Sequence, residues 1–188
     1  MSVLNPMKRF LTLVAVILSF SSFGNTKDTA TLTNFDNQTP DLRWLTVNDT
    51  VMGGRSRGGY QVDDGILVFT GRTNTNGGGF SSIRSVPQAL GLNESNEGLR
   101  MRIRGDGRVY TIRLETGTTR ASYWAYFPTN EDEWLDIRIP FTEFWPNWRG
   151  TRLSGPDLNK SAIESLGIMI YDNLDGPFRL EVDWIKSY

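Results

Sequence analysis

Residues 99 to 104, Leu-Arg-Met-Arg-Ile-Arg, alternate strictly between apolar and charged side chains. Successive side chains of a β-strand point to opposite faces of a sheet, so this segment is expected to bury its apolar residues and to expose its arginines. Gly105-Asp106-Gly107 interrupts the pattern, which resumes from Arg108 to Glu115. The interruption predicts an Asp-Gly hairpin that joins two neighbouring strands.

The same short alternating pattern recurs along the chain between clusters of Gly, Asn and Asp, and a helical period is nearly absent. Further strands are expected at residues 66–70, 80–85, 122–127, 134–139, 166–171 and 178–185. The segment 166–171 is apolar on both faces, which is typical of a central strand covered on each side. One helical turn is expected at Ser161–Glu164, with Ser161 as its cap. We therefore predict an all-β sandwich of about eight strands.

The N-terminus has the pattern of a secretory signal peptide. Lys8 and Arg9 precede an apolar run, residues 10–18, and then the small-residue stretch 19–24. The apolar run is shorter than the roughly 20 residues of a membrane span. We expect residues 1–24 to be a signal peptide and residues 25–188 to form a single domain exported to the periplasm, without a membrane span in the mature chain. An uncleaved N-terminal anchor is the alternative.

Composition excludes several classes of function. The chain has no cysteine and no histidine, which removes disulfides, thiolate nucleophiles, His-dependent triads and the usual transition-metal ligands. The net charge of −1 gives no reason to expect a nucleic-acid partner. The acidic run Glu131-Asp132-Glu133 lacks the spaced ligands of a calcium loop. We expect neither an enzyme nor a bound metal or cofactor.

The segment from Trp44 to Tyr60 is rich in polar and glycine residues. It lacks the lysine and the following helix of a phosphate-binding P-loop, and no βαβ unit surrounds it. Its Asn-Asp pair is expected to accept hydrogen bonds from turn amides, and its glycine pair to adopt positive φ, so that the loop presents two arginines. The candidate binding residues here are Asn48, Asp49, Met52, Gly53, Gly54, Arg55 and Arg57.

The arginine-rich block around Asp106 allows two interpretations. Asp106 lies between two glycines, so its carboxylate is expected to accept turn amides and to pair with Arg104 or Arg108. Alternatively, the arginines of 99–104 and Arg113 of the partner strand form one face that binds an anionic partner, unless nearby glutamates compensate them. The candidate residues are Arg100, Arg102, Arg104, Asp106, Arg108 and Tyr110.

Aromatic residues are dense between Trp124 and Trp148. Trp134 alternates with apolar residues of the same strand and is expected on the outer face, and Trp148 lies in an irregular segment. Both are candidate binding residues, although most tryptophans at strand period belong to a core. A planar row of exposed rings would favour a glycan, whereas a flat apolar patch rimmed by arginine would favour a protein.

Five blocks in order resemble the NADH:ubiquinone oxidoreductase (complex I) intermediate-associated protein 30 family. They are Trp44 with Asn48-Asp49, Met52-Gly53-Gly54 and Ser56; Gly78-Gly79-Phe80 with Ser82 and Arg84; Arg104-Gly105-Asp106-Gly107-Arg108 with Tyr110; Pro140-Phe141, Phe144, Pro146 and Arg149-Gly150; and Gly176-Pro177-Phe178, Leu180, Asp183 and Ile185. The resemblance implies a galactose-binding-like jelly roll and, from the family's mitochondrial members, an assembly factor.

The resemblance and the composition together give the functional prediction. We expect a non-enzymatic protein-interaction or assembly factor, a bacterial exported member of this family, whose partner is another protein or protein complex. The alternative is a carbohydrate-binding module that uses the same fold and its tryptophans to bind a glycan.

Overall fold

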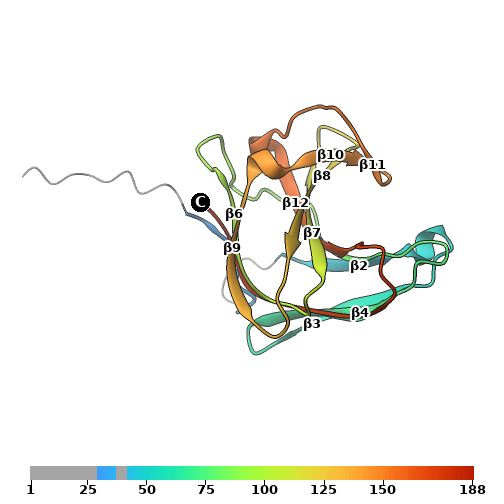
Figure 1. Ribbon diagram of the computed structural model, residues 1–188. Coiled ribbons are helices and arrows are strands. Elements are labelled where there is room, and N and C mark those ends of the chain that lie inside the picture. Colours follow the sequence, from blue (N-terminus) through green and yellow to red (C-terminus); the bar gives the residue numbers. More distant parts are fainter. Residues whose placement is uncertain (1–28, 37–41) are drawn as a thin grey trace, which may run out of the picture.

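The computed structural model describes residues 29–36 and 42–188 of the chain. They form two antiparallel sheets that pack face to face, joined by loops and by the short 3₁₀ turns η1 (Asp49–Met52), η2 (Phe141–Glu143) and η3 (Lys160–Ala162). Figure 1 shows both layers from the side. The all-β sandwich predicted from the alternating pattern is confirmed.

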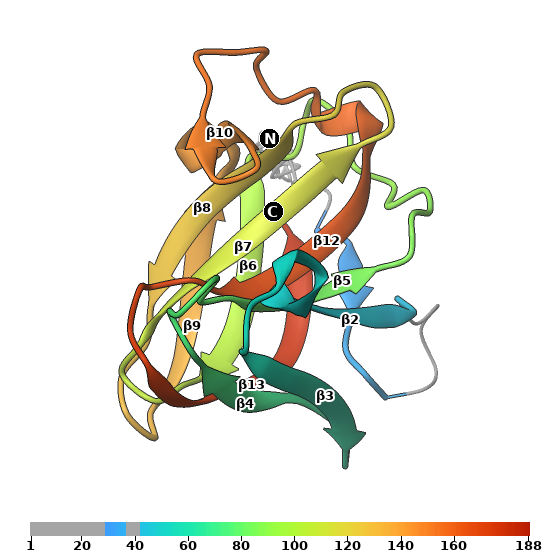
Figure 2. The same ribbon diagram turned by 90° about the vertical axis from the view of Figure 1, so that its right-hand side faces the viewer.

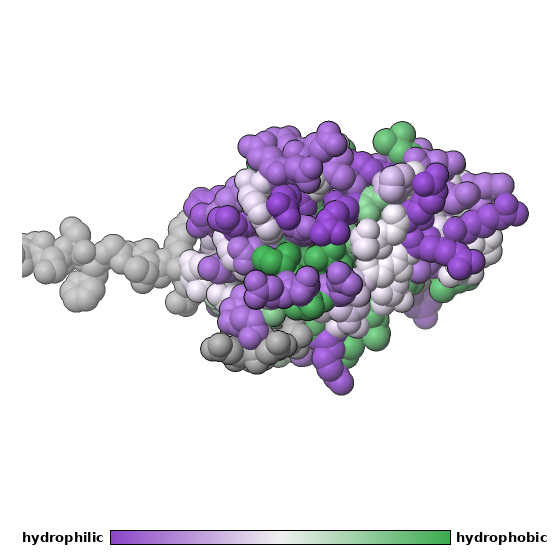
Figure 3. Space-filling view, turned by 90° about the horizontal axis from the view of Figure 1, so that it is seen from below, coloured by the Kyte–Doolittle hydropathy of each residue, from purple (hydrophilic) through white to green (hydrophobic). Residues whose placement is uncertain are grey.

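The first sheet has six strands in the order β3-β4-β13-β6-β9, with β1 also paired to β13. Its strands are β1 (Thr31–Thr33), β3 (Arg57–Asp63), β4 (Ile66–Thr73), β6 (Gly98–Arg104), β9 (Trp134–Pro140) and β13 (Gly176–Ser187). The long strand β13 lies between β4 and β6 and therefore holds this sheet together. Figure 3 views the molecule from the side on which β3 and β4 lie in Figure 1, where hydrophilic residues surround a small hydrophobic patch.

The second sheet has seven strands in the order β11-β10-β8-β7-β12-β5-β2. Its strands are β2 (Trp44–Asn48), β5 (Ser81–Ser85), β7 (Val109–Thr116), β8 (Ser122–Pro128), β10 (Trp145–Trp148), β11 (Thr151–Arg152) and β12 (Ile163–Ile170). The apolar segment predicted as a central strand is β12, which lies between β7 and β5. Figure 2 looks onto the outer face of this sheet.

The core fills the space between the two sheets. The inward residues Leu99, Met101 and Ile103 of β6 are fully buried, as are Ile112 and Leu114 of β7. Burial of each such side chain contributes about 1.5–3 kcal/mol relative to an exposed one. The alternation in the sequence thus reports directly which side of each strand faces the core.

All eight strands expected from the sequence form, but five others were not predicted: β1, β2, β3, β10 and β11. They are short or carry residues that weaken a strand prediction, such as Gly58-Gly59 in β3 and Pro146 in β10. The turn near Ser161 also differs from the expectation. It is a 3₁₀ turn that ends at Ala162, and Asn159, not Ser161, occupies its N-cap position.

The predicted hairpin between β6 and β7 is wrong. β6 pairs with β13 and β9 in one sheet, and β7 pairs with β12 and β8 in the other. The segment Gly105-Asp106-Gly107 carries the chain across the sandwich, because both strands bury an apolar face and these faces meet across the core. Arg113 of β7 therefore lies in the other sheet and does not join the arginines of β6.

The predicted signal peptide, residues 1–24, lies outside the described residues. No helix within the described part of the chain is long and apolar enough to cross a membrane.

Candidate functional site

The loop that follows β2 is built around the carboxylate of Asp49, which is fully buried. Its oxygens accept hydrogen bonds from the backbone N–H of Ser56 at 2.8 Å, of Gly79 at 2.6 Å and of Phe80 at 3.3 Å, and from the Ser56 hydroxyl at 2.6 Å. Burial raises the pKa of Asp49, but the hydrogen bonds from Gly79, Ser56 and Phe80 outweigh it and leave that pKa below its ordinary value. Asp49 thus joins the loop to the segment before β5.

Glycines make room for this carboxylate. A Cβ on Gly54 would lie 2.3 Å from Asp49 Cγ, and one on Gly78 would lie 2.4 Å from Asp49 Oδ2. Positive φ was expected at both residues of the Gly53-Gly54 pair, but only Gly53 has it, at 86°. Gly53 is therefore required by its backbone angle and Gly54 by the close approach of the carboxylate.

Asn48 connects the two sheets. Its side-chain Nδ2 donates to the Gly58 carbonyl at 3.1 Å, and its Oδ1 accepts from the Gly58 N–H at 3.2 Å and from the Ser81 hydroxyl at 2.6 Å. The predicted acceptor role of Asn48 and Asp49 is confirmed, and both side chains are occupied by the fold. They are structural residues of the loop and leave little capacity for a ligand.

The remaining loop candidates face outward. Met52 is 67% exposed and its neighbour Val51 is 70% exposed, both in the η1 turn. Arg55 and Arg57 are exposed as predicted, but they do not line the groove described below. The loop therefore consists of a rigid buried base and an apolar exposed tip.

The block around Asp106 is also a structural feature. Asp106 accepts from the backbone N–H of Arg108 at 3.2 Å and of Arg179 at 2.7 Å, and from the Tyr110 hydroxyl. Burial, together with Asp106, raises the pKa of Tyr110. The turn-amide role predicted for Asp106 is confirmed.

The arginine partners predicted for Asp106 are wrong. Arg104 forms an ion pair with Glu181, and Arg108 forms a bidentate pair with Asp172 at 2.8 and 2.6 Å. Arg108 also donates to backbone carbonyls of the segment between β12 and β13, including that of Leu174 at 2.8 Å. The chain reverses direction there, and Arg108 holds that reversal against β7.

The predicted arginine face exists on the outer side of β6 but is neutralised. Arg100 forms a bidentate pair with Asp136 at 2.7 and 2.6 Å, and Arg102 pairs with Asp183 at 3.2 Å. The ring of Trp134 packs beneath the guanidinium groups of Arg102 and Arg104, at 5.3 and 5.2 Å. Trp134 is on the outer face as predicted, but these arginines cover it. The acids that compensate the face are distant in sequence, whereas the sequence analysis considered only glutamates close to the arginines along the chain.

A groove of about 600 Å³ runs over the outer face of the seven-stranded sheet. Cross-strand register places Leu45, Arg84, Gly167, Arg113 and Trp124 in one row from β2 to β8. Residues directly opposite one another in antiparallel strands share a face, so Arg84 and Arg113 flank Gly167 from either side. A Cβ on Gly167 would lie 2.6 Å from Arg113 Cγ, so the glycine lets the Arg113 stem lie flat across the sheet.

The floor of the groove contains unpartnered donors. Arg113 is 8% exposed and pairs with Glu115, but its Nε has no hydrogen-bond partner. Asn147 is 1% exposed, and its Oδ1 accepts from the Gly150 N–H at 3.0 Å, which leaves its Nδ2 unpartnered. Buried donors without a partner are rare, because each loses its hydrogen bonds to water. Both donors therefore lack an acceptor among the described residues.

Aromatic rings cross the same groove without forming a plane. Trp124 packs against Trp145 at 5.5 Å and against Tyr171 at 6.4 Å, with interplanar angles of 56° and 90°. Trp124 is only 7% exposed. At the rim, Trp148 is 41% exposed and packs under Arg149. The apolar tip of the η1 turn also lines the groove. This turn lies in front of β5 and β12 in Figure 2.

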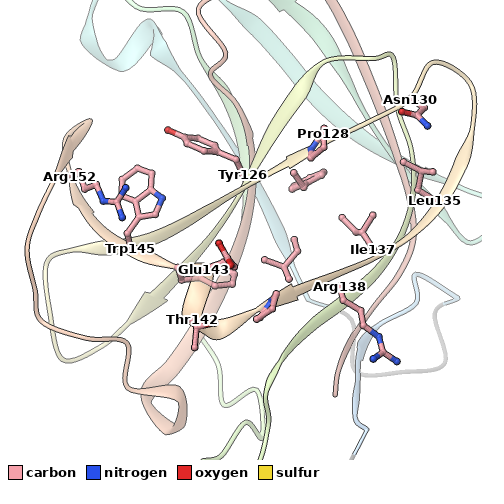
Figure 4. A pocket seen from close by; sticks show the side chains of 14 residues that line it. Tyr126, Pro128, Asn130, Leu135, Ile137, Arg138, Thr142, Glu143, Trp145 and Arg152 are labelled. Carbon is pink, nitrogen blue, oxygen red and sulfur yellow. The ribbon is translucent and has the colours of Figure 1, made fainter.

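A second cavity of about 690 Å³ lies at the open edge of the sandwich, between β9 and the strands β8 and β10 (Figure 4). Leu135 and Ile137, expected in the core, line it and are only partly buried, because β9 is the edge strand of its sheet. None of the unpartnered buried polar atoms of the described residues lines this cavity. The groove is therefore the better candidate site.

Comparison with known proteins decides the family. Residues 33–182 match the family model described as Complex I intermediate-associated protein 30. The chain belongs to this family. It is similar to the mitochondrial complex I intermediate-associated protein 30 of Mus musculus, with 33% identity over 98 residues, which cover 48% of this chain and 30% of the mouse protein. The Drosophila melanogaster relative is 26% identical over 179 residues, 80% of this chain and 60% of that protein.

The chain thus spans less than two thirds of these relatives. Solved structures with the same fold include family 11 carbohydrate-binding modules of Clostridium thermocellum. One, in complex with a mixed-linked tetrasaccharide, has a TM-score of 0.56 at 18% identity over 85% of this chain and 94% of the module. Another has a TM-score of 0.59 at 20% identity over 87% of this chain and 96% of the module. At these identities the likeness shows the fold, a galactose-binding-like jelly roll.

Most residues of the family blocks maintain the fold. They belong to the loop around Asp49, to the turn at Asp106 and to the contacts of Arg108 with Asp172. Five of their residues also line the groove: Met52, Phe80, Arg84, Arg149 and Gly150. Sequence reasoning missed Asn147 and assigned Arg113 to the face of β6, because pairing across β7, β8 and β10 is what brings the two residues to one groove. The available signal was Gly167, a glycine inside the apolar strand β12, which indicates close approach of another group.

Proposed function

We propose that this member of the complex I intermediate-associated protein 30 family is a non-enzymatic assembly factor that binds another protein, in line with the association with an intermediate that its relatives' names state. We propose that the groove is its contact surface. The observation that carries the proposal is the exposed apolar tip, Val51 and Met52, which the buried Asp49 holds rigidly at the rim. Large exposed apolar side chains next to a groove are typical of protein interaction sites.

The chemistry of the groove supports binding without catalysis. Glu115 is the carboxylate among its lining residues, and it is paired with Arg113. Hydrolysis by paired carboxylates requires two such groups across a cleft. Among the described residues, no group of His, Cys, Asp and Glu side chains could hold a metal ion.

Glycan binding by the same groove is the second candidate, because family 11 carbohydrate-binding modules share the fold. A stacking platform needs an exposed ring face, and the groove rings are tilted or edge-to-face with Trp124 nearly buried. This arrangement favours a protein over a sugar.

The test is partner capture with rim variants. Tagged protein is incubated with an envelope or organelle extract of its own source, and the captured proteins are identified for the native chain and for the double variant Val51→Ser with Met52→Ser. We expect the double variant to lose the specific partner. Leu174→Ser is the matched control, since Leu174 is 57% exposed and lies outside the groove.

A glycan array run on the same variants separates the two candidates. Retention of the same captured proteins by the double variant would contradict the proposal. Glycan binding that is lost on Trp148→Ala, without specific protein capture, would make the carbohydrate module the better account.

We propose that the mature protein acts after export to the periplasm, because the pattern of residues 1–24 is that of a secretory signal peptide. The relatives named above are mitochondrial. The signal-peptide pattern of this chain therefore predicts a compartment different from theirs.

A further inference from the structure

The charges that line the groove do not balance. Arg84, Arg113, Arg120 and Arg149 line it together with a single acidic residue, Glu115. The arginines of β6 differ, because Arg100, Arg102 and Arg104 each have a carboxylate partner. The lining of the groove therefore carries an excess of positive charge that the outer face of β6 does not.

The imbalance is greatest at the floor. Arg113 is nearly buried and Arg84 is half-buried, and both interact with Glu115. Burial and then the nearby Arg84 lower the pKa of Arg113 to about 10, and burial lowers the pKa of Arg84. Both guanidinium groups stay protonated at neutral pH, so two desolvated cations share one carboxylate.

The geometry leaves a place for a second carboxylate. Arg84 and Arg113 lie on strands separated only by β12, about 10 Å apart at their Cα atoms by ordinary strand spacing, with Gly167 between them. The Nε of Arg84 donates to the Ser82 hydroxyl at 3.3 Å, and no ion pair of Arg84 with a carboxylate is found within the described residues. Arg113 Nε and Asn147 Nδ2 are donors without acceptors in the same groove.

We infer that the groove receives an acidic side chain, Glu or Asp, from a segment of the partner protein, with its carboxylate between Arg84 and Arg113. The apolar neighbours of that side chain would pack on the rim formed by Val51, Met52 and Trp148. This inference rests on the proposed function, since it names the chemistry of the partner at the same groove. A carboxylate in this position accepts hydrogen bonds from both guanidinium groups and neutralises the excess charge, which a neutral glycan would not do.

The experiment selects ligands without assuming the identity of the partner protein. A displayed library of random peptides is enriched on the native protein, on Arg84→Gln and on Arg72→Gln. Arg72 is exposed on β4 of the other sheet, so its variant changes net charge equally without touching the groove. We expect peptides with a central Glu or Asp beside apolar residues on the native protein and on Arg72→Gln, but not on Arg84→Gln.

The affinity of one selected peptide then measures how much its acidic residue and Arg84 contribute to binding. Replacement of its acidic residue by the amide, or Arg84→Gln in the protein, should weaken binding by about tenfold or more, as for loss of a charge-assisted hydrogen bond. Glu115→Gln frees Arg113 from its internal partner and should strengthen binding. A variant that gains affinity cannot be explained by failure to fold.

The outcomes are distinct. Selected peptides that lack acidic residues but lose binding on Trp148→Ala would overturn the carboxylate inference while leaving the groove as a protein site. Absence of any selected peptide, together with binding of oligogalacturonate through Arg84, would overturn both the inference and the proposed protein partner, in favour of an acidic glycan.

Discussion

Asp49 is a buried carboxylate whose surroundings favour its charged form. Its pKa is lowered, because the amides and hydroxyl that face it outweigh the cost of burial. A carboxyl group with a lower pKa in the folded state than in the unfolded state stabilises the fold above the unfolded value, about 3.9 for Asp. That contribution is lost as the pH falls through the folded pKa.

We therefore predict that Asp49→Asn destabilises the protein by about 1–3 kcal/mol at neutral pH, since an amide NH₂ would face donors. Urea denaturation should also show that the native chain loses more stability than the variant between neutral pH and about pH 3. Asp63→Asn, at the exposed end of β3, is the control. Equal acid sensitivity of native chain and Asp49→Asn would show that the carboxylate is not ionised in the fold.

Two glycines of the loop are required for different physical reasons, the space available to a side chain at Gly54 and the backbone angle at Gly53. Gly54→Ala should cost roughly 1–3 kcal/mol, because the added Cβ would lie 2.3 Å from Asp49 Cγ. Gly53→Ala should cost about 1–2 kcal/mol from its positive φ alone, since nothing lies within 4 Å of its Cβ. Gly59→Ala has neither problem and should be close to neutral. The combination Gly54→Ala with Asp49→Ala should recover part of the Gly54 loss, and thermal unfolding of the set tests this.

At the scale of elements, two bidentate Arg–Asp pairs join segments that are distant in sequence, one pair buried and the other exposed to water. Arg108 and Asp172 have side chains only 11% and 7% exposed, whereas Arg100 and Asp136 are 41% and 37% exposed. A partner removed from a buried pair leaves an isolated charge, while an exposed pair is screened by water.

Arg108→Gln should therefore destabilise by about 3–5 kcal/mol, and Arg100→Gln by much less, because its pair is exposed to water. Hydrogen exchange should become faster in residues 172–176 only in the Arg108 variant, because its guanidinium binds the carbonyls of that segment. Similar losses in both variants would mean that the Arg108 pair is not protected from solvent.

At the scale of the whole molecule, the alternation of residues in β6 and β7 predicted which side chains are buried, but not the sheet to which each strand belongs. Gly105-Asp106-Gly107 has the composition of a hairpin, yet the chain crosses the sandwich there, because the choice depends on partners such as β13 and β12 far away in sequence. Arg113 was consequently placed on the wrong surface. The groove combines residues of β5, β7, β8, β10 and β12, so no local pattern other than Gly167 within β12 pointed to it.

The location of the mature protein is tested by its N-terminus. If residues 1–24 are a signal peptide, protein purified from its own source should begin at or near Asn25. Recovery of chains that keep Met1 or Met7 in a soluble cytoplasmic fraction would contradict export. A chain that keeps its N-terminus in the membrane fraction would support the uncleaved anchor.

The position of β13 determines when the protein can fold during synthesis. This strand pairs with β4 and β6, and its last residues lie 83 positions after the end of β6. A ribosome that adds about 5–20 residues per second needs about 4–17 s to cover that distance. During this interval the six-stranded sheet lacks its middle strand, and the edges of β4 and β6 that pair with β13 have no strand beside them. The two halves of this sheet can therefore join only once β13 has been synthesised.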